Sequence, residues 1–274
     1  MATHPGLTPA PTDTPADTPA GTPTGPDQPH GSAVRVRGLH RRFSEAGGVL
    51  NGLDLDIAPG EFVALLGRSG SGKSTLLRAL AGLDRDVAGH GTIEVPTNVS
   101  VVFQDSRLLP WKRVLDNVVL GLPGKHARAR GRTALEEVGL GGRDRAWPHQ
   151  LSGGEQQRAA LARSLVREPA LLLADEPFGA LDALTRIRMH TLLRRLCEAH
   201  RPAVLLVTHD VDEAIVLADR VIVLDDGVVR SDLTVQLRGR RSQADPEFAA
   251  LRTRLLGELG VVDDADAVRT EAAS

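Results

Sequence analysis

Two glycine-bearing segments of this chain have residue types suited to holding phosphate groups. The first has a glycine, four further residues and then Gly72-Lys73-Ser74. Glycines in this pattern let backbone N–H groups turn towards phosphate oxygens. Lys73 would then reach the β- and γ-phosphates, and the Ser74 hydroxyl would ligate Mg²⁺. The predicted nucleotide-binding residues of this loop are Gly67, Arg68, Ser69, Gly70, Ser71, Gly72, Lys73, Ser74 and Thr75.

The second segment is Leu151-Ser152-Gly153-Gly154-Glu155, and a helical pattern over 155–166 follows it. The start of a helix can present N–H groups to an anion. The loop at 67–75 already cradles the phosphates of its own chain, so a second phosphate site has no use there. The two segments make sense together if two chains close face to face over shared nucleotide.

Other polar residues follow apolar runs that read as strands. Asp175 and Glu176 end the run that begins at Leu171, where open α/β sheets place their ligands. Asp175 is suited to hold Mg²⁺, and Glu176 to accept a proton from water. Gln104 ends a strand predicted at 101–104, and His209 ends one at 204–209. Each residue alone also fits a plain structural role as a helix cap or a solvated side chain.

These elements must hold the two segments in place. The apolar run at 62–66 and the helical pattern at 75–80 give the strand–turn–helix context that the first motif requires. Strands near 34–57 and this strand would build the core, which resumes from residue 171 to about 235. A mainly helical part at about 105–165 would contain helices at 113–122, 127–138 and 155–166.

In this order, the motifs resemble the ATP-binding cassette (ABC) ATPases over about residues 34–235. The resemblance implies an α/β P-loop fold with a mixed-sheet core, an inserted helical lobe, ATP and Mg²⁺. It implies that Glu176, His209, Lys73 and Gln104 are catalytic, and that Ser74, Gln104 and Asp175 surround the metal. It also implies the following set of residues acting on the nucleotide of the opposing chain: Ser152, Gly153, Gly154 and Asp182.

The family also stacks adenine on an aromatic residue near the first strand, and Phe43 stands at that place. In the family, the Gln104 position senses a transmembrane partner, and a permease helix docks on the nearby surface. Trp111 is therefore either an anchor for that helix or part of the lobe core. The implied partners are a second copy of the chain, two permease subunits and an extracytoplasmic solute-binding protein, at the cytoplasmic side of the cell membrane.

The stretch Arg107-Leu108-Leu109-Pro110-Trp111 looks like the nitrate, sulfonate and taurine importer group. Residues 111–118 and 232–235 are most similar to the aliphatic sulfonate importers. Taurine, nitrate and a thiamine precursor remain open as the solute. A soluble ABC ATPase of DNA repair or translation is a further alternative, which the single cassette and the short spacing between the two segments disfavour. A cassette with a dead ATPase site is disfavoured because every catalytic position is present.

Composition is consistent with a globular protein of this class. Of 274 residues, 41% are hydrophobic, and the formal net charge of −2 gives no sign of a nucleic-acid partner. The single Cys197 excludes a disulfide within one chain. No apolar stretch approaches the roughly 20 residues that cross a bilayer.

The remaining segments complete the predicted organisation. Residues 1–32 and 262–274 are predicted to be disordered tails around a domain at 33–236. Residues 237–261 would form a basic loop with Arg238, Arg240 and Arg241, followed by a helix at 246–259. That loop is either solvated or in contact with anionic lipid.

Overall fold

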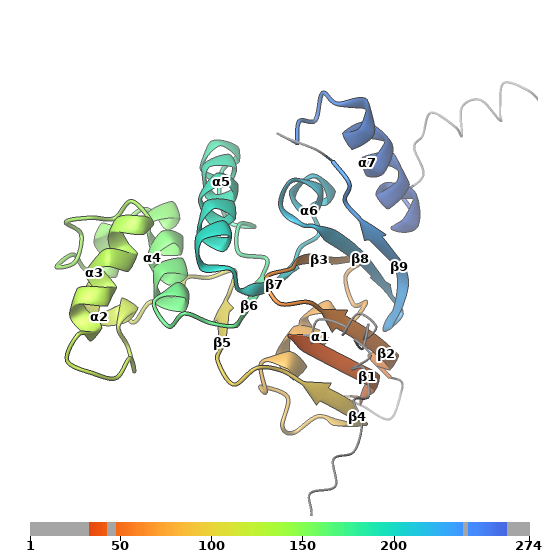
Figure 1. Cartoon of the computed structure of the whole chain (residues 1–274), viewed down its shortest axis with the longest axis horizontal. Coiled ribbons are helices and arrows are strands. Elements are labelled where there is room, and N and C mark those ends of the chain that lie inside the picture. Colours follow the sequence, from red (N-terminus) through yellow and green to blue (C-terminus); the bar gives the residue numbers. More distant parts are fainter. Residues whose placement is uncertain (1–32, 43–47, 238–240, 262–274) are drawn as a thin grey trace, which may run out of the picture. The chain divides into compact units, whose positions relative to one another are not determined.

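A computed structural model describes residues 33–42, 48–237 and 241–261, which belong to one compact unit. The predicted tails at 1–32 and 262–274 lie outside the described residues. Within the unit, two sheets and the helices around them form an α/β fold (Figure 1). The chain therefore has the predicted fold class.

The larger sheet has six strands in the order β5-β6-β7-β3-β8-β9. The first five run parallel, and β9 closes the edge antiparallel to β8. The central strands are apolar runs with both faces buried, which is typical of parallel sheets. The strands are β3 (Phe62–Gly67), β5 (Val99–Val102), β6 (Leu171–Asp175), β7 (Ala203–Val207), β8 (Arg220–Asp225) and β9 (Val228–Thr234).

The smaller sheet is antiparallel, in the order β2-β1-β4. Its strands are β1 (Val34–Arg42), β2 (Leu50–Ile57) and β4 (Ala88–Glu94). Strand β4 is largely exposed and contains Gly89 and Gly91, so no apolar run in the sequence marks it. A Cβ atom at Gly91 would lie 2.5 Å from the Gly38 carbonyl oxygen, so glycine permits the close approach of β4 to β1.

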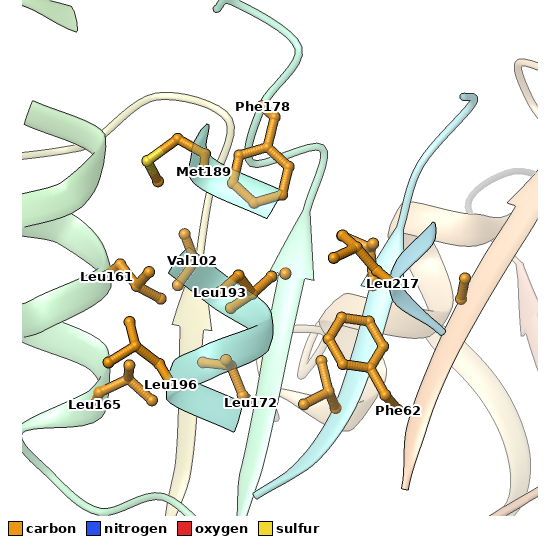
Figure 2. Packing of buried hydrophobic residues seen from close by; sticks show 14 of the residues in the cluster. Phe62, Val102, Leu161, Leu165, Leu172, Phe178, Met189, Leu193, Leu196 and Leu217 are labelled. Carbon is orange, nitrogen blue, oxygen red and sulfur yellow. The ribbon is translucent and has the colours of Figure 1, made fainter. Parts of the chain in front are cut away.

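Helices cover both faces of the large sheet. The helices outside α2 and α3 are α1 (Lys73–Leu80), α4 (Gly153–Leu165), α5 (Ala183–His200), α6 (Val211–Leu217) and α7 (Pro246–Glu258). Side chains of α1 and the small sheet pack with Val63 and Leu65 of β3. The opposite face of β3, with Phe62, packs in the cluster that includes α4, α5 and α6 (Figure 2). Each face of the sheet is therefore removed from water by a different set of elements.

The helical lobe contains α2 (Val114–Val118), α3 (Ala127–Glu137), the short 3-10 helix η1 (Pro148–Gln150) and α4. The helix predicted at 113–122 is shorter than expected, since Val119 ends α2 and Gly121 adopts a φ of +69°. The helix predicted from Glu155 begins two residues earlier, because Ser152 is its N-cap.

The C-terminal helix α7 confirms the helix predicted at 246–259, with Phe248 and Leu255 fully buried. Arg241 fits neither reading of the basic loop. Its side chain is only 6% exposed, and it donates to carbonyl oxygens at the end of α6, including that of Ile215 at 2.8 Å. Arg238 and Arg240 lie outside the described residues.

Candidate functional site

The loop between β3 and α1 carries the first predicted phosphate site. Gly72 adopts a φ of +101° at the start of α1, and a Cβ there would lie 2.7 Å from the Val49 carbonyl oxygen. Lys73 is 8% exposed, and its Nζ donates to the carbonyl oxygens of Gly67 and Arg68, both at 2.8 Å. Residues 68–70 are exposed along the rim of the loop. The loop therefore folds around the lysine and leaves an open backbone edge.

Oxygen ligands stand beside this loop at the end of β6. The Ser74 hydroxyl donates to Asp175 Oδ1 over 3.5 Å. A hydroxyl and a carboxylate fit Mg²⁺, which typically takes one or two protein oxygens and completes its shell with water and phosphate. Among the described residues, no group of three or more His, Cys, Asp and Glu side chains could hold a metal ion. The donor set therefore suits a magnesium ion that arrives with a nucleotide.

Burial and charge act on both sides of the loop. Burial lowers the pKa of Lys73, while the carboxylates of Glu176 and Asp175 act in the opposite direction. Burial raises the pKa of Asp175, and the neighbouring Glu176 raises it further. Two carboxylates and a buried ammonium group therefore lie close together. The ammonium group would offset the charge of an anionic ligand, and the carboxylates would offset the charge of a divalent cation bound with it.

Glu176 and His209 meet above the ends of β6 and β7. His209 Nδ1 lies 3.2 Å from Glu176 Oε2, and the side chains are 67% and 31% exposed respectively. Glu176 adopts a φ of +45°, a conformation that costs a non-glycine residue about 1–3 kcal/mol and is common at functional sites. The alternative that His209 caps a helix is wrong, because Asp210 is the N-cap of α6.

Gln104 lies just past its strand rather than at its end. The last pair of β5 with β6 is Val102 with Ala174, and the Phe103 carbonyl oxygen accepts instead from Gln157 Nε2 of α4 at 2.9 Å. The strand predicted to reach Gln104 therefore stops at Val102. Gln104 is exposed, and its Nε2 lies 3.3 Å from the position that a Cβ on Gly179 would take.

The second predicted phosphate site is the exposed start of α4. The Ser152 Oγ accepts from the Glu155 N–H at 3.3 Å, and the Glu155 carboxylate accepts from the Ser152 N–H at 2.9 Å. This capping box lowers the pKa of Glu155. The first N–H groups of a helix have no intrahelical acceptor, so those of Gly153 and Gly154 point outward from α4.

Asp182 lies beside this helix start. It caps α5 by accepting from the Thr185 N–H at 3.0 Å, and hydrogen bonds from the side chain and the backbone of Thr185 lower its pKa. Ser152, Gly153, Gly154 and Asp182 line one groove between α4 and α5. The structure thus brings together the four residues predicted to act on the opposing chain.

Trp111 is 70% exposed, so the prediction that Trp111 belongs to the lobe core is wrong.

Asn117 of α2 is fully buried, and its role in holding the turn before α2 was not predicted from the sequence. Its side chain accepts from the Leu109 N–H at 2.7 Å and donates to the carbonyl oxygens of Lys112 and Arg113 at 3.0 and 3.1 Å. No pattern in the sequence marks this asparagine.

The site described above includes neither Phe43 nor Cys197. Phe43, predicted to stack on adenine, lies outside the described residues. Cys197 is partly buried on α5, and burial raises the pKa of its thiol to about 12. Among the described helices, none combines the length and the apolar character needed to cross a membrane.

Comparisons with known proteins agree with this geometry. Residues 50–179 match the family model for ABC transporters. An aliphatic sulfonates import ATP-binding protein of Rhizobium johnstonii is 67% identical over 234 residues, which cover 85% of this chain and 94% of the relative. A protein of the same description from Streptomyces avermitilis is 69% identical over 231 residues, covering 84% and 92%.

Solved structures give the same result. The dimeric ATP-binding cassette MJ0796, in a post-hydrolysis state bound to ADP and Pi, is 31% identical with a TM-score of 0.65. The match covers 74% of this chain and 99% of that one. CbiO1 of Clostridium perfringens, part of an ABC transporter complex, is 27% identical with a TM-score of 0.68, covering 75% and 89%. The chain belongs to the ABC transporter family, as one of its ATP-binding cassettes.

Proposed function

We propose that this chain hydrolyses ATP in an ABC importer and couples hydrolysis to the uptake of aliphatic sulfonates. The observation that carries the proposal is the 67–69% identity to aliphatic sulfonate import proteins over 92–94% of their length. The alternatives of taurine, nitrate and a thiamine precursor differ in the solute alone. ABC ATPases of DNA repair or translation carry a long coiled coil between the two segments, zinc-binding cysteines or tandem cassettes. None of these features is seen in the described part of this chain.

Within one chain, the loop at 67–75 holds the phosphates, and Lys73 contacts the β- and γ-phosphates. Ser74, Asp175 and Gln104 are the proposed ligands of Mg²⁺, which neutralises charge on the phosphate oxygens when bound. Glu176 would accept a proton from the attacking water, and His209, which lies 3.2 Å from it, would contact the γ-phosphate. The 3.2 Å separation of these two side chains supports a shared task.

Two copies close around two nucleotides, with Ser152, Gly153 and Gly154 of one facing the loop of the other. The support is the outward direction of the first N–H groups of α4, which suit a phosphate. Asp182 lines the same groove and would sense the partner. ATP favours the closed pair, and loss of the γ-phosphate releases it.

A permease subunit would dock where Trp111 stands. The exposed indole projects from a turn whose backbone is held by the buried Asn117. Tryptophan in such a place is a common anchor of protein interfaces. Two permease subunits and an extracytoplasmic solute-binding protein would complete the importer, with this chain peripheral on the cytoplasmic side.

The proposal is tested by measuring ATP hydrolysis of the chain reconstituted with the permease encoded beside it. A solute-binding protein loaded with an alkanesulfonate, taurine or nitrate is added in separate reactions. Stimulation by the alkanesulfonate-loaded form alone is the expected result. Strong hydrolysis that responds to neither permease nor solute would instead favour a soluble ABC ATPase.

Trp111→Ala provides a second test, of the permease contact. Loss of a buried interface tryptophan costs about 2 kcal/mol or more. We expect the variant to hydrolyse ATP normally by itself and to lose most of its stimulation by the permease. Leu120→Ala, at another exposed apolar residue of the lobe, serves as the matched control. Equal stimulation of the Trp111 variant and the wild type would remove the indole from the interface.

A further inference from the structure

His190 of α5 lies between two buried groups that belong to different parts of the site. Its Nε2 lies 2.8 Å from Glu213 Oε1 of α6, and the two side chains are 13% and 4% exposed. On another side its ring meets Phe178 edge-on, with centroids 5.1 Å apart at an angle of 66°. Phe178 is itself buried in the core (Figure 2). The imidazole is therefore held from two directions.

Those two neighbours follow the two proposed catalytic side chains in the sequence. Phe178 comes two residues after Glu176, and Glu213 comes four residues after His209. The Glu213 N–H donates to Asp210 Oδ1 at 3.1 Å, which ties Glu213 to the residue next to His209. His190 thus contacts one side chain from the segment that follows each member of the Glu176–His209 pair.

We propose that His190 is a positioning residue that fixes the separation of Glu176 and His209. It does so by contacting Phe178 behind the first and Glu213 behind the second. The inference rests on the proposed roles of Glu176 and His209, and it adds a residue that touches neither the nucleotide nor the reacting water.

Arg186 supports the same arrangement from the preceding turn of α5. Its Nη1 lies 3.6 Å from Asp210 Oδ2, so α5 holds the first turn of α6 at two points. Asp182 caps the start of α5, and His190 follows about two helical turns later. The helix that lines the groove beside Ser152 therefore also fixes the Glu176–His209 pair.

The test compares steady-state ATP hydrolysis of His190→Leu with that of wild type. A small misplacement of catalytic groups lowers kcat without weakening substrate binding, so we expect kcat to fall about tenfold and KM to change less than about twofold. His190→Gln, whose Nε2 can reach Glu213, should recover most of the rate. Phe178→Leu removes the ring contact with His190 while keeping an apolar side chain in the core, and it should also lower kcat.

The matched control is His200→Leu at the far end of the same helix. His200 Nε2 lies 3.1 Å from Glu137 Oε2, so this control removes a second histidine–glutamate contact of α5 that is remote from Glu176. We expect its kcat to equal that of wild type. If His190→Leu and Phe178→Leu both keep the wild-type kcat, or if His200→Leu lowers kcat equally, the inference is wrong.

The double variant His190→Leu/His209→Ala separates the two proposals. If His190 acts through the pair, its replacement should have little further effect on kcat once His209 is gone. An undiminished tenfold loss in that background would overturn the inference. If His209→Ala by itself leaves kcat unchanged, the proposed role of His209 fails. If His209→Ala lowers kcat and the His190 variants do not, the positioning role alone fails.

Discussion

The two segments proposed to bind phosphate differ in what the rest of their own chain supplies. The loop before α1 has the buried cation Lys73 and the acids Asp175 and Glu176 around it. The start of α4 is exposed, and its polar contacts come from the capping box between Ser152 and Glu155. The first segment therefore lies among groups suited to catalysis, whereas the start of α4 offers N–H groups and a hydroxyl.

This contrast explains why one chain carries two such segments. A helix start binds an anion weakly unless further groups enclose it. Gly153 faces open space, whereas a Cβ at Gly154 would lie 2.7 Å from Thr185 Cγ2 of α5. One glycine is thus explained by packing within the chain and the other is not. The open side at Gly153 is where we propose that the opposing chain lies.

The largest expected effect is on the catalytic side of the comparison. Glu176→Gln keeps the shape of the side chain and removes the base, so kcat should fall about 10²–10⁴-fold. Nucleotide binding should remain, because the loop at 67–75 is unchanged. Single-turnover hydrolysis and binding of a fluorescent ATP analogue measure the two quantities.

Lys73→Ala is compared with Glu176→Gln, because loss of the lysine should lower the affinity for the nucleotide. Near-normal turnover of the Glu176 variant would exclude this carboxylate as the base. Unchanged ATP binding by the Lys73 variant would count against the role of the loop. The pair of variants therefore separates binding from chemistry within the first segment.

A smaller loss is expected when charge is added to the second segment. Gly153→Asp places a carboxylate at the start of α4, where a Cβ has open space and the negative charge interacts favourably with the helix dipole. The folded chain should be as stable as wild type or slightly more stable. Hydrolysis should fall about 100-fold, because the new charge repels the phosphate of the opposing chain.

Gly153→Asn is the control for that variant, since it adds nearly the same bulk without the charge. Size-exclusion chromatography with ATP should show pairs for the wild type and monomers for Gly153→Asp. If the aspartate variant hydrolyses ATP at the wild-type rate, the start of α4 does not face a phosphate in the working enzyme.

Much of the site could be predicted because its motifs are local. The loop at 67–75 is continuous in sequence, and Asp175, Glu176 and His209 each follow an apolar strand. Parallel strands bring such ends to one edge of a sheet, so their proximity follows from the strand order. The comparisons confirm the family that these motifs predicted.

The remaining features depend on contacts between distant residues. The strand before Gln104 stops early because Gln157 of α4 donates a hydrogen bond to the Phe103 carbonyl oxygen. Arg241 looked like a surface charge, yet it caps the end of α6 from a segment 26 residues away. The His190–Glu213 contact joins two helices across 23 residues without a periodic pattern. Such contacts arise from tertiary packing, which local propensity does not encode.

The smallest expected effect concerns Asp175, which stands beside the first segment at the end of β6. Burial and Glu176 raise its pKa, so the folded chain holds this proton more tightly than the unfolded chain does. The ionised carboxylate therefore lowers the free energy of unfolding at pH 7, and this cost shrinks as pH falls through the raised pKa towards the ordinary value of about 3.9.

Asp175→Asn should accordingly raise the unfolding midpoint at pH 7, and the gain should shrink as pH falls towards the ordinary pKa of about 3.9. The same variant should hydrolyse ATP more slowly, because a neutral amide holds Mg²⁺ less well than a carboxylate. Asp86→Asn, at an exposed aspartate, controls for the change of net charge. A lower midpoint for Asp175→Asn at pH 7 would mean that the carboxylate stabilises the fold. A variant that is more stable but slower would show that the partly buried charge of Asp175 lowers stability and is needed for hydrolysis.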